Sequence, residues 1–159
     1  MDTKTSCFGP IKLTSSFLPD ETTEQLRTYF RQRTNWLTLA AEASLKMQKY
    51  LKLINFRLDV VVKDFRGLAG LAIIADICNG NLDPQKLVEH RHYNCRKNKE
   101  EIAKALKGNN RKDYLFGLKQ EYESYMFFQS KLTDCDKQIE SLMKTEIEIS
   151  STKKTTDLK

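Results

Sequence analysis

The stretch that decides the fold runs from Asp20 to Phe56 and reads DETTEQLRTYFRQRTNWLTLAAEASLKMQKYLKLINF. It contains no proline or glycine, so nothing in it interrupts a helix. Asp20 is a residue type that caps helices, and Glu21 and Glu24 suit a first turn. Seven of nine positions at alternating steps of four and three are apolar or alanine, as in a coiled coil: Leu26, Phe30, Arg33, Leu37, Ala40, Ser44, Met47, Leu51 and Ile54. We therefore predict one long helix over residues 20–56.

A second stretch of the same kind follows later in the chain, over residues 111–147. All nine positions of its stripe are apolar: Leu115, Leu118, Tyr122, Tyr125, Phe128, Leu132, Cys135, Ile139 and Leu142. At 1.5 Å per residue the first helix is roughly 55 Å long, more than a compact small domain needs. The two helices should pair antiparallel, because the chain between them has to return, and form a coiled-coil stalk.

The segment between the two long helices, residues 57–110, has shorter apolar runs and dense breaks. Gly67 and Gly70 interrupt it, Asn79-Gly80 should end one helix, and Asp83-Pro84 should begin another. This pattern predicts a small helical head of about four pieces.

The fold class is therefore all-α: two long antiparallel helices with a small helical head. Residues 1–19 read as irregular chain. Residues 148–159 are polar, have little to bury, and are expected to be a disordered tail.

Some apolar side chains fall outside both stripes: Leu45, Tyr50, Leu53, Phe127 and Met143. They predict a homo-oligomer formed through the stalk, in which a second copy covers them. Folding of the head onto these residues is the alternative.

No apolar run reaches the roughly 18–20 residues that span a bilayer, and the first ten residues do not resemble a signal peptide. A cytoplasmic protein with no membrane partner is expected.

The four cysteines contain no Cys-x-x-Cys pair. His90, His92 and Cys95 lie close in sequence but lack further ligands at the usual spacing, so no metal or other cofactor is predicted.

The net charge of +6 is unevenly distributed. Between Glu24 and Arg66 the balance is +5, between Gln85 and Gln120 it is +6, and from Glu121 onward it is −2. Basic residues interleaved with Tyr29 and Trp36 favour a nucleic-acid partner, although a solvated helix surface would show the same charge. The candidate nucleic-acid-binding residues are Arg27, Arg31, Arg33, Lys46, Lys49, Arg96, Lys97, Lys104 and Arg111.

Catalytic motifs are not found in the sequence. There is no Gly-x-Ser-x-Gly elbow and no phosphate-binding Gly-x-x-x-x-Gly-Lys run. Asp134 and Asp136 are two positions apart on a predicted helix and point to different faces, which disfavours a shared metal. The chain alone is predicted to be inactive, with no catalytic residue assigned.

Several local strings, taken in order, resemble the central region of the insertion-sequence one-ten family of transposases, the Piv/MooV-like DEDD type. Each string is ordinary, but their order and spacing are specific, and the similarity covers residues 15–143. The strings are Ser16–Pro19, Leu26–Arg27, Arg31–Arg33, Val61–Ile74, Gly80–Leu87, Cys95–Lys97, Glu101–Asn109, Arg111, Leu115–Gln120 and Asp134–Glu140.

The resemblance implies a parent protein with three parts. Members of the family have a RuvC-like domain whose four acidic residues bind metal (Mg²⁺), a helical coiled-coil joining region, and a domain with a serine nucleophile. A structured RNA guides the known members. This chain matches the joining region and the very end of the RuvC-like part. The acidic tetrad would lie upstream of Ser16, where residues 1–13 offer only Asp2, so no catalytic residue carries over.

The sequence is accordingly interpreted as a fragment of a bacterial insertion-sequence transposase, a transposable-element protein of DNA transposition and recombination. It would supply assembly and DNA-binding and RNA-binding contacts, with DNA and guide RNA as partners. The alternative is a stand-alone helical nucleic-acid-binding or scaffold protein.

Overall fold

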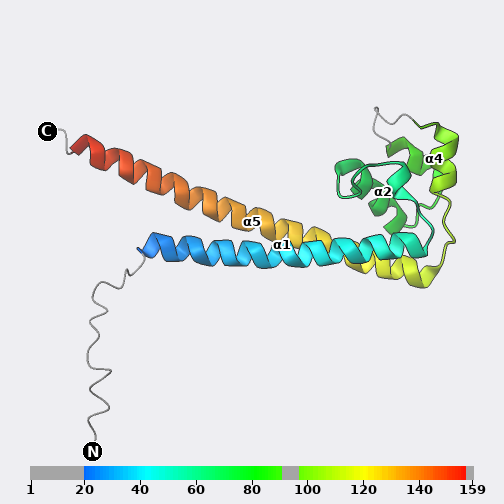
Figure 1. Cartoon of the computed structure of the whole chain (residues 1–159), viewed down its shortest axis with the longest axis horizontal. Coiled ribbons are helices and arrows are strands. Elements are labelled where there is room, and N and C mark those ends of the chain that lie inside the picture. The colour runs from blue at the N-terminus through cyan, green and yellow to red at the C-terminus, as the bar shows by residue number, and fades with distance from the viewer. Residues whose placement is uncertain (1–19, 91–96, 157–159) are drawn as a thin grey trace, which may run out of the picture.

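Two long helices form a stalk, with five short helical segments at one end of it (Figure 1). The computed structural model describes residues 20–90 and 97–156. Within these ranges the chain contains helices and no strand, which confirms the all-α prediction. The elements, in chain order, are α1 (Glu21–Leu53), η3 (Leu58–Val60), α2 (Leu68–Cys78), α3 (Pro84–Leu87), η4 (Val88–His90), α4 (Lys99–Ala105) and α5 (Lys112–Thr156).

The stalk helices α1 and α5 run antiparallel and pack against each other along stripes spaced as in a coiled coil. At one end of the stalk the Thr22 hydroxyl donates to the Glu146 carboxylate at 2.9 Å, and further along Lys46 lies 3.8 Å from Glu121. Each helix carries a stripe at strict steps of four and three, and every residue of both stripes is buried or half-buried. If the register of the Thr22–Glu146 hydrogen bond is extended along both stripes, the facing positions, from the free end to the head, are Thr22 with Glu146, Leu26 with Leu142, Tyr29 with Ile139, Arg33 with Cys135, Trp36 with Leu132, Ala40 with Phe128, Ala43 with Tyr125, Met47 with Glu121, Tyr50 with Leu118 and Ile54 with Tyr114.

At every second position, the predicted stripe of α1 lies one residue away from the stripe that faces α5 in the structure. Phe30 and Leu37 were expected in the seam but are 51% and 49% exposed. The seam passes through Tyr29 and Trp36 instead. The predicted and observed stripes share every second position, so periodicity alone could not separate them. The stacking of Trp36 on Phe128, with ring centroids 6.0 Å apart, favours the observed stripe.

The ends of the long helices also differ from the prediction. Asp20 occupies the N-cap of α1 but makes no side-chain capping hydrogen bond. Helix α1 ends at Leu53 rather than 56, and Asn55 then adopts a φ of 64°, outside the helical region. Helix α5 does not stop at 147: it continues to Thr156, since no proline or glycine follows Gly117. The expected disordered tail is thus helical as far as that residue, while residues 157–159, like 1–19, lie outside the described ones.

The head follows from its turn residues. Gly67 precedes α2 and Asn79 ends it, with Gly80 at a φ of +86°, as the Asn-Gly pair predicted. The Asp83 carboxylate accepts from the Gln85 backbone N–H at 3.0 Å and caps α3. The head core consists of side chains without measurable exposure or nearly so: Ile73, Ile74, Ile77, Leu87, Ile102 and Leu106.

The head packs against only one of the two long sides of the stalk, which we call the head side. On this side of α1, Ser44 and Leu51 are 6% and 4% exposed, and Leu51 belongs to the same hydrophobic core as the head residues. On α5 Leu115 and Tyr122 pack against the same core. Burial raises the pKa of the Cys78 thiol of α2 to about 11, and the charges of Lys119 and Glu123 on α5 also act on it, so α2 lies next to this side. We call the opposite side, marked by Lys46 and Lys131, the open side.

None of the helices in the described residues is both long enough and apolar enough to cross a membrane.

Candidate nucleic-acid interface

An aromatic cluster lies on the open side, near the middle of the stalk. The Trp36 indole stacks on Phe128 with an interplanar angle of 25° and meets Phe127 edge-on at 6.3 Å between centroids. Phe128 is half-buried, whereas Phe127 is 52% exposed. The Lys131 ammonium lies 5.4 Å from the centre of the Phe127 ring. An exposed ring braced by half-buried rings, with a cation beside it, is suited to stacking a flat ligand.

Two of the predicted basic residues lie on the same side. The Lys46 side chain is 59% exposed, and its only carboxylate contact in the described part of the chain is Glu121, at 3.8 Å. Lys49, one turn further, is exposed. Because Glu121 is six residues from Phe127 on α5, Lys46 lies about 9 Å along the stalk from the ring, and Lys49 about 13 Å. Against the three lysines stand Glu42, Glu121 and Asp134, which lies seven residues after Phe127 on the same face of α5, so the local charges balance.

Three other predicted residues are held in ion pairs. Arg27 bonds Glu24 at 2.8 Å. Arg111 bonds Asp113 at 2.5 Å, with its guanidinium 4.0 Å from the centre of the Tyr114 ring. The hydrogen bond between these two side chains is the main cause that raises the pKa of Arg111 and lowers the pKa of Asp113. The third, Arg33, lies in the stalk seam and bonds Asp136 of α5 at 2.6 Å, which gives it a structural role.

The remaining predicted residues are dispersed. Arg31 lies toward the free end of α1, away from the seam, while Lys97 and Lys104 lie in the head; all three are exposed. Arg96 lies outside the described residues. The structure therefore brings Lys46 and Lys49 together with a residue that the sequence did not single out, Lys131, and does not gather the predicted residues into one surface.

The exposed ring of Phe127 was also missed as a site residue, since sequence reasoning assigned it to self-association. The signal available was the Phe127-Phe128 doublet followed by Lys131 one turn on. In a helix only one residue of such a doublet can face the seam, so the other must lie at its edge.

One close pair of titratable groups in the head joins two of its helical elements. His90 Nε2 lies 2.6 Å from an Asp76 carboxylate oxygen, and the Asn81 amide donates to the same oxygen at 3.5 Å. This pair ties η4 and the loop after α2 to α2 itself. Among the described residues no group of three or more histidine, cysteine or acidic side chains is arranged to hold a metal ion.

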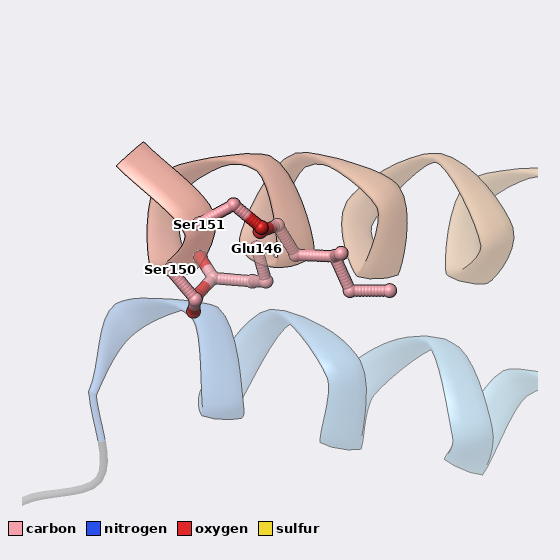
Figure 2. Close-up of a pocket in the computed structure, with 4 residues that line it drawn as sticks. Glu146, Ser150 and Ser151 are labelled. Atoms are coloured by element: carbon pink, nitrogen blue, oxygen red, sulfur yellow. The ribbon is translucent and has the colours of Figure 1, made fainter. Parts of the chain in front are cut away.

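An open groove lies at the free end of the stalk, where α5 passes the start of α1. Figure 2 shows its lining side chains on α5, between the two helices. The lining is Glu146, Ile147, Ser150 and Ser151. It has no basic residue and therefore does not suit an anionic ligand.

In comparisons with protein-family models, with curated proteins and with solved structures, no match to this chain was found.

Proposed function

We propose that this chain is a nucleic-acid-binding module whose stalk takes up an unpaired stretch of RNA or DNA on its open side. The observation that carries the proposal is the exposed Phe127 ring, braced by Trp36 and flanked by Lys131. Unpaired bases present π-faces of any sequence to such a ring, and lysines at this distance reach the adjoining phosphates. Binding should therefore depend on salt and show little sequence preference.

The resemblance described above supports a more specific placement. In that reading the chain is the joining region of an insertion-sequence transposase, and its open side contacts the guide RNA or the DNA during transposition. Mg²⁺ would belong to the RuvC-like domain of the parent protein and catalysis to its acidic tetrad and serine. The competing reading is a stand-alone helical binding or scaffold protein. Coding sequence for the tetrad and the serine domain beside this gene would favour the transposase.

The proposal is tested by the fluorescence anisotropy of a labelled short oligouridine titrated with the purified chain. Loss of one stacked base costs about 1–3 kcal/mol, so Phe127→Ala should weaken binding roughly tenfold or more. Phe116→Ala is the matched control, because Phe116 is also on α5, is 66% exposed, and lies outside the aromatic cluster. Equal effects of the two changes, or no binding by the wild type, would overturn the proposal. Circular dichroism verifies that both variants keep their helices.

A further inference from the structure

Beyond the head, the head side of the stalk carries a strip of exposed apolar side chains. On α1, the line of residues buried on the head side at Leu51 and Ser44 continues at steps of seven to Leu37 and Phe30. On α5, the equivalent line runs from Tyr122 through the polar residues Gln129 and Asp136 to Met143, with Ile147 one turn further. Four large apolar residues are thus 49–63% exposed on one side of the stalk: Leu37, Phe30, Met143 and Ile147.

This strip is centred on the part of the stalk that the head leaves free. The hydrogen bond between Thr22 and Glu146 fixes how the two helices lie side by side. By this alignment Ile147 is level with residue 21, and the last residue of α5, Thr156, is level with residue 12. The uncovered side extends from Ser44 to that tip, about 48 Å at 1.5 Å per residue, and its midpoint falls within about 3 Å of Phe30.

The apolar residues are placed almost symmetrically about the same midpoint. Leu37 lies seven residues from Phe30 toward the head. On the other side of Phe30, Ile147 is level with residue 21, which is nine residues from Phe30 toward the tip. A strip that is symmetric about its centre is complementary to an inverted copy of itself, which is the requirement for an isologous dimer.

We infer that a second copy of this chain covers the strip, with the two stalks antiparallel and a two-fold axis perpendicular to them near Phe30. The head determines this direction. In a parallel dimer both heads would occupy the same space between the facing stalks. In an antiparallel dimer the free tip of each copy lies against the head of the other. In this arrangement Leu37 of one copy lies level with Ile147 of the other, at the groove in Figure 2.

The available area suits a stable dimer. Two helices, each about 10 Å across, lie side by side over about 35 Å between Ser44 and Glu21, and α5 alone continues for about 13 Å, which together present roughly 800 Å² per copy. This corresponds to roughly 1,600 Å² in total, within the range of specific protein–protein interfaces. The inference is independent of nucleic-acid binding, because it uses the opposite side of the stalk.

Sedimentation of the purified chain over a concentration series tests the inference. The wild type should be a dimer at tens of micromolar, and the double change Phe30→Ser with Leu37→Ser should weaken dimerisation about tenfold or more. Leu45→Ser is the control: Leu45 is 65% exposed on α1 but lies one position past the buried Ser44, off the head side. A monomeric wild type, or equal effects of the head-side and control changes, would overturn the inference.

Disulfide formation between copies tests the direction of the stalks without relying on a destabilised variant. Leu37→Cys and Ile147→Cys proteins, each also carrying Cys7→Ser and Cys95→Ser, are oxidised with diamide both separately and as an equimolar mixture of the reduced proteins. The mixture should form a disulfide-linked dimer of the two different proteins, while neither should link to itself, since like positions lie about 24 Å apart along the stalk. Linkage of Leu37→Cys to itself would contradict the antiparallel arrangement.

Discussion

The Trp36 indole meets the exposed ring of Phe127 edge-on, with 6.3 Å between the ring centroids. These residues come from different helices and are 91 positions apart in the sequence. Their contact puts the tryptophan beside the surface proposed to bind nucleic acid. Because the chain contains one tryptophan, its fluorescence reports on that surface alone.

The polar interruption of the seam at Arg33 predicts a stabilising substitution. Arg33 bonds Asp136 at 2.6 Å, but both side chains are partly exposed, and such pairs contribute about 0–1 kcal/mol. Arg33→Leu should leave stability unchanged or raise it by about 1 kcal/mol, because it extends the apolar seam. Arg33→Glu should lower it, since it places a second carboxylate beside Asp136. Urea unfolding at one fixed protein concentration measures both, and a larger loss for leucine than for glutamate would contradict this account.

The close packing of Tyr50 on Gly117 predicts a coupled pair. A Cβ added at Gly117 would lie 2.4 Å from the Tyr50 ring, so Gly117→Ala forces the ring to move and should cost about 1–3 kcal/mol. Tyr50→Leu removes the far end of the ring and should reduce the cost of the alanine. A double-mutant cycle by thermal unfolding measures the coupling. Strictly additive effects would show that the two residues do not touch.

The half-buried thiol of Cys78 predicts slow alkylation at neutral pH. Burial raises the pKa of Cys78 from 9.0 to about 11, because the thiolate loses its hydration. Its reaction with iodoacetamide, followed by mass spectrometry of the Cys78 peptide, should therefore still be accelerating between pH 9 and 11. A rate that levels off near pH 9 would indicate an exposed thiol.

The same raised pKa links folding to alkaline pH. Since the folded state holds this proton more tightly than the unfolded state, its contribution to stability is complete below pH 9.0 and is lost as the pH rises through about 11. Cys78→Ser, which has no thiol to titrate, should lose less stability than the wild type across that interval. Parallel curves for the two proteins would rule out the linkage.

The sequence was sufficient for the two long helices, because unbroken runs without proline or glycine and stripes at steps of four and three are local properties. It could not choose the phase of α1, since Phe30 and Leu37 fit one stripe as well as Tyr29 and Trp36 fit the other; only the facing helix decides. The end of α5 was missed because a polar tail has nothing to bury. The helix nevertheless continues, with the Ser151 hydroxyl bonded to the Ile147 carbonyl at 2.8 Å.

The candidate site was less accessible to prediction, because charge counts do not show which cations are already paired. Arg33 reads as a free cation in the sequence, yet its partner Asp136 is 103 residues away. Likewise, the register of the stalk decides that Phe128 is covered and Phe127 is left at the surface. Both facts depend on long-range pairing rather than on local pattern.

Titration of the Trp36 fluorescence with short oligouridine tests the central claim most directly. The account predicts saturable quenching at low salt. With about three phosphate contacts, affinity for a single strand should fall roughly twentyfold between about 50 and 200 mM salt. Changing Lys46, Lys49 and Lys131 together to glutamine should weaken binding and flatten that salt dependence. Binding that leaves the Trp36 emission unchanged, or that the triple change does not weaken, would contradict the claim that the open side of the stalk is the nucleic-acid interface.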